Sequence, residues 1–159
     1  MEFTSITEYF YKIYIRVTLI ILLPVAGFVF TYLQPSENSS ESFKLFTTVI
    51  PVLTALLLAW TVVFIFFNKK IKTTRKRQGL RAKLEKYFLI TTVRYSVFSL
   101  CSLLLALMFY QTRIDFFVFA FLAQVLVCIF VWPTPTKICG DLKLKGDERE
   151  MVYYKKDVL

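Results

Sequence analysis

The sequence predicts an all-α integral membrane protein: four transmembrane helices in an antiparallel, up-down-up-down bundle, with both termini in the cytoplasm. Four apolar runs of 17 to 24 residues fill more than half of the 159-residue chain. A helix needs roughly 20 residues to cross a hydrocarbon core of about 30 Å. Hydrophobic residues make up 57% of the chain, more than a soluble domain of this length needs for its core. Basic residues gather on one side of the runs, which sets the orientation.

The apolar runs divide the chain into a membrane domain and a tail. We expect spans at about 12–33, 46–68, 86–110 and 114–132. Together they form a four-span transmembrane domain over residues 1–136, with a basic cytoplasmic loop at 69–86. Residues 137–159 form a short charged cytoplasmic tail, which is too small to hold a core alone. We expect one short helix in it from about Asp147, and the tail to be either mobile or docked on a partner.

Start signals precede the first two spans. Ser5 and Glu8 have the spacing of a capping box, which predicts that the first helix starts near Ile6, well before the membrane. Asn38 and Glu41 have the same spacing and predict the start of the second helix. Asn38 also begins a glycosylation sequon on the predicted outer side, which has meaning only in an organism that glycosylates secreted proteins.

The later turns and breaks are also visible. Pro24 and Pro51 lie inside the first two predicted spans, where each is expected to bend its helix. Thr112 and Asp115 have capping-box spacing, so the outer turn between the last two spans is very tight. The fourth span stops at residues 132–135, where a Trp marks the interface and two prolines remove helix donors.

The third helix is expected to begin before its span. Leu80, Leu84 and Phe88 recur at i, i+4 and i+8, directly after Gly79. Such a spacing is typical of one apolar face of a helix. We therefore expect a break at Gly79 and a helix that already begins on the cytoplasmic side.

The distribution of Lys and Arg predicts the orientation. The chain up to Arg16, the loop at 69–86 and the tail carry 17 basic residues together, and the opposite side carries two, Lys44 and Arg113. By the positive-inside rule both termini are cytoplasmic, and a cell or cytoplasmic (inner) membrane is the expected location. A cleaved signal peptide over residues 12–27 is a competing interpretation, but this stretch is longer than an h-region.

Arg94 is the most informative single residue, because it lies inside the third span. An arginine there is costly unless it is paired or hydrated. In one interpretation its long side chain reaches back to the headgroups. In the other it faces the bundle, within a sector of small and hydroxylated residues that permits close helix packing: Thr91, Tyr95, Ser99, Ser102 and Ala106. No acid lies deep within a predicted span to neutralise it, since Asp115 stands at the outer edge of the fourth.

Gln124 adds a second polar position in the membrane. Ala120, Gln124 and Cys128 recur at i, i+4 and i+8 on the fourth helix. A glutamine near the membrane midplane should seek a hydrogen-bond partner, so the stripe predicts helix packing. A pore lining is the alternative, although a proton-coupled pump would place Asp, Glu or His there.

The basic loop predicts contact with anionic lipid headgroups at the cytoplasmic face. The expected contact residues are Lys69, Lys70, Lys72, Arg75, Lys76, Arg77 and Arg81. A docking surface for an acidic protein is the alternative. Nucleic acid is not an expected partner, since no aromatic residues alternate with these charges.

The sequence predicts no enzyme, cofactor or metal site. The chain has no histidine, which removes histidine-based acid–base chemistry and histidine metal ligands. Its four glycines form no phosphate-binding loop. The three cysteines, without a CxxC pair, are expected to be reduced and to act as small hydrophobes.

Two hypotheses for function remain from the sequence. The favoured one is a non-enzymatic accessory or scaffold subunit that associates with other membrane proteins or with itself. The alternative is a small oligomeric transporter or channel, in which Arg94 acts on an anionic ligand.

Overall fold

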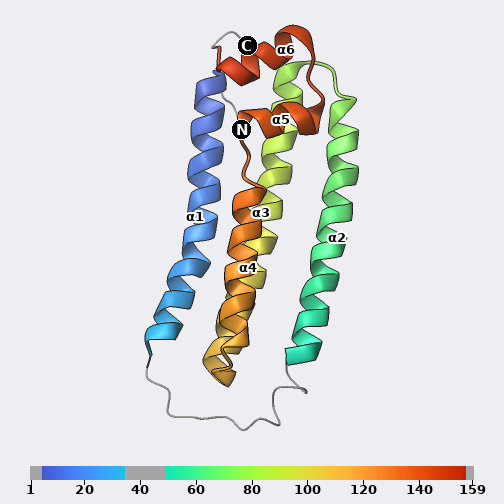
Figure 1. Cartoon of the computed structure of the whole chain (residues 1–159). Helices are drawn as coiled ribbons and strands as arrows, with labels where there is room; N and C mark the ends of the chain where they lie inside the picture. Colours follow the sequence, from blue (N-terminus) through green and yellow to red (C-terminus); the bar gives the residue numbers. More distant parts are fainter. Residues whose placement is uncertain (1–4, 35–48, 157–159) are drawn as a thin grey trace.

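The computed structural model describes residues 5–34 and 49–156, and the regular structure in these ranges is helical (Figure 1). The described helices are α1 (Ile6–Leu33), α2 (Ile50–Arg75), α3 (Leu80–Thr112), α4 (Phe116–Phe130), α5 (Pro135–Leu142) and α6 (Gly146–Tyr154). Three of them, α1, α2 and α3, are long and apolar enough to cross a membrane. A fourth candidate span arises only if α4 and α5 count as one bent span. The prediction of a helical chain with several apolar helices of membrane-spanning length is thus confirmed.

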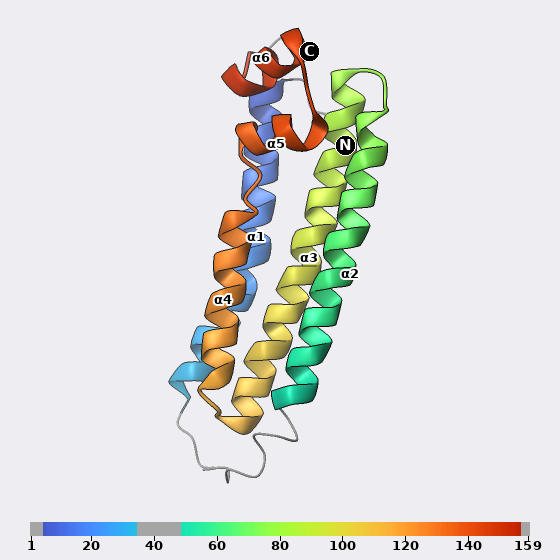
Figure 2. The ribbon, with the colours of Figure 1, turned by 45° about the vertical axis from the view of Figure 1, so that its right-hand side comes forward.

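Helix α3 is the centre of the bundle. It packs against α1, α2 and α4, and successive long helices run in alternating directions (Figures 1 and 2). The start of α1, the turn between α2 and α3, and helices α5 and α6 lie together at one end, which we call the basic end. The turn between α3 and α4 lies at the other end.

Helix α1 begins where the capping signal predicts. Ser5 is its N-cap, and the Ser5 hydroxyl oxygen accepts a hydrogen bond from the Glu8 backbone N–H at 3.1 Å. The buried residues that follow recur every three or four positions, from Ile6 and Tyr9 to Ile13 and Val17. This stripe faces α3, so the helix is buried on one side from its first turn onward.

Ser5→Ala is expected to fray the start of α1, because a first-turn N–H loses its acceptor. Loss of a serine cap costs about 1 kcal/mol. Hydrogen exchange of the amides in residues 6–9 should therefore become about fivefold faster. Ser5→Asp keeps a capping oxygen and should leave the exchange rates close to those of the parent chain. Equal acceleration in both variants would show that the serine oxygen does not hold this turn.

The two prolines occupy different places in their helices. Pro24 lies inside α1, which remains helical through it. Pro51 lies in the first turn of α2, where a proline removes no hydrogen bond that the helix uses. The bend expected from Pro51 inside a span is therefore wrong. The start signal expected from Asn38 and Glu41 lies outside the described residues, as does the sequon.

The segment at 69–86 is mostly helical, which differs from the loop expected there. Helix α2 continues to Arg75 and α3 begins at Leu80, so the connection is only 76–79. Gly79 has φ +84, a conformation that favours glycine. The expected break at Gly79 and the early start of the third helix are confirmed. Because α2 stays helical, its basic residues stand on the surface of a helix.

The turn between α3 and α4 is tight, as predicted, but its details differ. Arg113 is left-handed with φ 53, and its Nη1 donates a hydrogen bond to the Thr31 carbonyl oxygen at 2.9 Å, which ties the turn to α1. Thr112 is the last residue of α3 and Asp115 is the N-cap of α4, without a side-chain capping bond, so α4 does not start with the capping box expected from Thr112 and Asp115. Helix α4 has 15 residues and rises only about 22 Å. It is shorter than the predicted span at 114–132.

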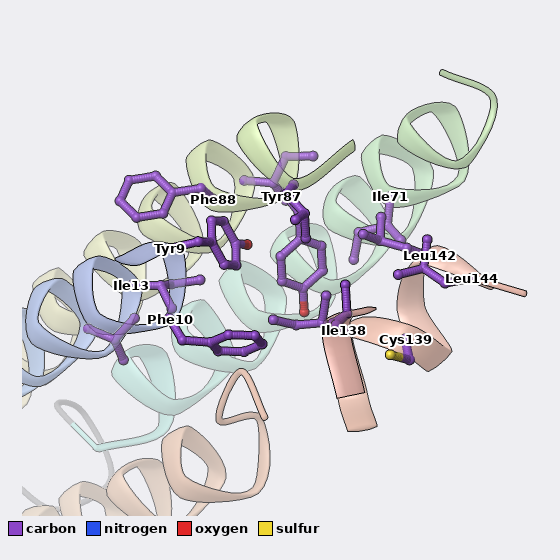
Figure 3. Packing of buried hydrophobic residues seen from close by; sticks show 14 of the residues in the cluster. Tyr9, Phe10, Ile13, Ile71, Tyr87, Phe88, Ile138, Cys139, Leu142 and Leu144 are labelled. Carbon is purple, nitrogen blue, oxygen red and sulfur yellow. The ribbon is translucent and has the colours of Figure 1, made fainter. Parts of the chain in front are cut away.

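The tail folds back onto its own bundle. Helix α5 is turned by 76° from α4, so it crosses the basic end, and α6 lies beyond it (Figures 1 and 2). Buried residues from both helices, among them Ile138, Leu142 and Val152, join one hydrophobic cluster with the first halves of α1 and α3 (Figure 3). The expected helix from about Asp147 corresponds to α6. Helix α5 was not expected, and the described part of the tail is docked within the chain.

Candidate functional site

A buried polar seam joins α3 to α4. The Gln124 amide nitrogen donates hydrogen bonds to the Phe98 carbonyl oxygen at 2.7 Å and to the Ser102 hydroxyl oxygen at 3.0 Å. The Ser102 hydroxyl donates in turn to the Phe98 carbonyl at 3.0 Å. Gln124 and Ser102 are both buried. In a membrane, hydrogen bonds of this kind hold helices together.

A second contact lies nearer the basic end. The Tyr95 hydroxyl donates a hydrogen bond to the Cys128 carbonyl oxygen at 3.2 Å. Tyr95 is buried, and its ring meets Phe98 edge-on. The structure therefore brings together Tyr95, Ser102 and Gln124 from the predicted polar sector. Thr91 is buried and Ser99 is half-buried on the same helix, and neither takes part in these hydrogen bonds.

Arg94 is half-buried, and its charge lies near an acid that the sequence analysis did not find. The guanidinium carbon stands 5.8 Å from the centre of the Phe98 ring, close enough for a cation–π attraction. The carboxylate of Asp141, on α5, acts on Arg94 electrostatically. The acid comes from outside the apolar runs, because α5 folds back across the end of the bundle.

Asp141 connects three helices at the basic end. Its carboxylate accepts a hydrogen bond from the Tyr87 hydroxyl of α3 at 2.8 Å. Its backbone carbonyl accepts one from Nε of Arg75, on α2, at 2.6 Å. Tyr87 is buried, and in Figure 3 its hydroxyl points toward α5. Asp141 thus fixes α5 to α2 and α3 through both its side chain and its backbone.

Lys137 adds a further positive charge to this region. Its Nζ donates a hydrogen bond to the Phe130 carbonyl oxygen at the end of α4, at 2.9 Å. Burial lowers the pKa of Lys137, the positive charge of Arg94 acts in the same direction, and Asp141 opposes both. We call the four residues Tyr87, Arg94, Lys137 and Asp141 the α5 anchor. They join the end of α4, α3 and α5 by charges and hydrogen bonds.

Helix α6 is held by an ion pair of its own. Lys83 Nζ on α3 lies 2.7 Å from the carboxylate of Glu148. The Lys83 side chain is 14% exposed and that of Glu148 is 34% exposed, so the pair is only partly screened by solvent. Neither residue was a candidate from the sequence, since ion-pair partners so far apart leave no local pattern.

The residues expected to contact lipid headgroups are mostly exposed at the basic end. Six of them are exposed on the last turns of α2, the following turn and the first turn of α3: Lys69, Lys70, Lys72, Lys76, Arg77 and Arg81. Arg75 is half-buried, and its bond to Asp141 directs it inward. Six of the seven side chains are therefore exposed, and one of these six, Arg81, lies 3.7 Å from the carboxylate of Glu85 on the same helix.

An apolar groove runs between α2 and α4. It has a volume of about 220 Å³ and is lined mostly by Leu53, Leu57, Trp60, Ala120, Ala123 and Gln124. Helix α2 is the least covered of the long helices. In the most apolar stretch of α2, 6% of the residues are buried. The corresponding share is 22% for α1 and 44% for α3. Helix α2 thus packs on α3 and, near its C-terminal end, on α5, and it leaves most of its apolar stretch open.

Among the described residues there is no group of His, Cys, Asp and Glu that could hold a metal ion. Comparison with protein-family models, with curated proteins and with solved structures finds no match. The site therefore rests on its own geometry. The residues that sequence reasoning missed are Asp141, Tyr87 and Lys83. The sequence signal that could have predicted α5 was Thr134, its N-cap, whose hydroxyl oxygen accepts a hydrogen bond from the Lys137 N–H at 3.3 Å.

Proposed function

We propose that this chain is a non-enzymatic accessory or scaffold subunit of a membrane assembly and that it binds a transmembrane helix of a partner protein. In this proposal α1 to α4 cross the membrane in an up-down-up-down order, with α4 as a short fourth span. The exposed basic residues on α2 then face the cytoplasm with both termini, as the positive-inside rule requires. The location is the cell membrane or the cytoplasmic (inner) membrane.

The open surface of α2 carries the proposal. Only 6% of its most apolar stretch is buried within the chain. Lipid can cover such a surface, but helix pairs in membranes are stabilised by close packing and interhelical hydrogen bonds. The groove beside α2 offers both. A partner helix lying along the groove would pack against the apolar stretch of α2 on a second side.

The lining of the groove indicates the chemistry of the partner. Ala120 and Ala123 of α4 are small, so the backbone of a second helix can come close. The volume of about 220 Å³ has room for large apolar side chains, but not for a whole helix. Trp60 is half-buried, and its indole N–H donates to no other residue in the described ranges. The partner is therefore an apolar helix that inserts bulky side chains and offers an acceptor near Trp60.

A photo-reactive phenylalanine analogue tests this proposal in native membranes. Placed at Leu57 in the groove, it should form a covalent adduct that mass spectrometry maps to an apolar segment of a second membrane protein. The control is the same analogue at Leu22 of α1, since Leu22 is 58% exposed and Leu57 is 65% exposed. The adduct should be at least tenfold more abundant from Leu57.

Three other outcomes would contradict the proposal. Adducts only with lipid would show that acyl chains fill the groove. Adducts only with a second copy of this chain would make the groove a self-association surface. Equal protein adducts from Leu57 and Leu22 would show random collision in the membrane.

Transport by a small oligomer, with Arg94 attracting an anion, has less support. The charge of Arg94 is already placed near Asp141 and the Phe98 ring. The amide nitrogen of Gln124 and the hydroxyls of Tyr95 and Ser102 are bonded within the chain. These groups connect helices, and a polar path through the bundle would need them to be free.

A further inference from the structure

A hollow of about 510 Å³ lies between α5 and α6, and its lining includes no residue of the groove or of the α5 anchor. Three basic residues, Lys143, Lys145 and Arg149, contribute to its lining. The hydroxyl-bearing residues Thr136 and Tyr153 lie around the same hollow. No carboxylate is among its lining residues in the described part of the chain. The hollow, which we call the α5–α6 pocket, therefore carries a local charge of about +3.

The backbone between the two helices holds the basic residues in place. Lys143 ends α5 in a left-handed conformation, with φ 52, and its N–H bonds to the Gly140 carbonyl at 3.2 Å. Leu144 follows and is buried in the hydrophobic cluster, so the turn cannot move without exposing it. Lys143 and Lys145 flank this fixed residue. The two ammonium groups are thus carried by an anchored turn and not by a free loop.

The acids of α6 do not cancel this charge. Glu148 is paired with Lys83 at 2.7 Å. Glu150 lies 3.7 Å from Lys156 and lines an adjoining hollow on α6, which shares Arg149 and Tyr153 with the α5–α6 pocket. Arg149 makes no ion pair with another residue of the described ranges. Its guanidinium, with five donors in a planar fork, is suited to two oxygens of one phosphate group.

We propose that the α5–α6 pocket binds the phosphate of an anionic phospholipid headgroup. A lipid is favoured by the position of the pocket. Helix α5 begins within five residues of the end of α4 and is turned by 76° from it, so it lies across the end of a membrane-spanning helix. Trp132 stands between the two helices, and tryptophan is typical of the membrane interface. Phosphate groups of the bilayer are at that level.

Native mass spectrometry of the full chain in mild detergent tests the proposal. The ligands are phosphatidylglycerol, phosphatidylcholine and inorganic phosphate, each at equal concentration. The parent chain should retain one phosphatidylglycerol, with weaker retention of phosphatidylcholine and none of free phosphate. Lys143→Gln with Arg149→Gln should weaken phosphatidylglycerol binding about 25-fold, about fivefold for each lost charge.

The control is Lys69→Gln with Lys72→Gln, which removes the same charge from exposed residues of α2. It should change retention of the bound lipid less than twofold. Slow alkylation of Cys139, which is 7% exposed, reports in each variant that α5 and α6 are still docked. If both double variants lose the lipid equally, attraction is diffuse and the proposal is wrong. Equal binding of free phosphate would assign the pocket to a soluble anion. Unchanged retention of phosphatidylglycerol in Lys143→Gln with Arg149→Gln would show that the pocket does not bind the lipid.

Discussion

Asp141→Ala is expected to loosen α5 from the bundle and to give the largest structural effect of any single substitution outside the apolar helices. The variant removes the acceptor of the buried Tyr87 hydroxyl. It also removes the carboxylate that acts electrostatically on Arg94. Removing one partner of a buried polar pair leaves the other unsatisfied. Because Asp141 itself is half-buried, solvent screens part of the loss. We expect a cost of about 2 kcal/mol for the docked state of α5.

Alkylation of Cys139 by a membrane-impermeant maleimide measures this loss. Cys139 is buried on α5, two residues before Asp141 in the chain (Figure 3). Burial raises the pKa of its thiol, although Arg149 acts in the opposite direction, so the docked thiol is both covered and little ionised. Opening of α5 removes both protections. A cost of about 2 kcal/mol predicts labelling about 30-fold faster than in the parent chain.

Two further variants separate the contributions to this anchor. Tyr87→Phe removes only the hydroxyl donor and should accelerate labelling about fivefold. Asp147→Ala removes an exposed acid from the first turn of α6 and should leave the rate within twofold. If Asp141→Ala and Asp147→Ala label at the same rate, net charge governs the tail and Asp141 is not its anchor.

The sequence predicted the helices better than the packing between them, and the reason is physical. An apolar run of membrane length and the Ser5 cap are local signals, because a helix satisfies its own backbone hydrogen bonds. The same holds for the break at Gly79. The expectation for Pro51 failed because the effect of a proline depends on its position in the helix. In the first turn of α2 it removes no helical hydrogen bond. The apolar sequence around it did not indicate where that turn lies.

The candidate site was predicted on α3 and α4 but not at the basic end. Gln124 and Ser102 could be paired in advance because a three-residue turn forces α3 and α4 to lie side by side. The acid near Arg94 could not be predicted from the sequence. Asp141 lies far along the chain and reaches α3 only because α5 turns back. Spacing along a helix says which side chains share a face. It does not say which distant helix covers that face.

Gln124→Met is the second substitution with a large expected effect. Methionine has nearly the length of glutamine, so the space between α3 and α4 stays filled. The hydrogen bonds from the amide nitrogen to the Phe98 carbonyl and the Ser102 hydroxyl are lost. Interhelical hydrogen bonds in membranes contribute about 1–2 kcal/mol in peptides and less in whole proteins. The free energy of unfolding in mixed micelles should therefore fall by about 1 kcal/mol, measured by SDS titration with tryptophan fluorescence.

A double-mutant cycle with Ser102→Ala decides whether the seam acts as a unit. Ser102 both accepts from Gln124 and donates to the Phe98 carbonyl, so the two residues share one acceptor. The coupling between the substitutions should be about 0.6 kcal/mol. Ser99→Ala is the matched control, because this half-buried serine of α3 takes no part in the seam. Its coupling to Gln124→Met should be near zero. A coupling as large for Ser99 as for Ser102 would mean that Gln124→Met disturbs α3 as a whole, and that the hydrogen bonds are not what fastens α4 to it.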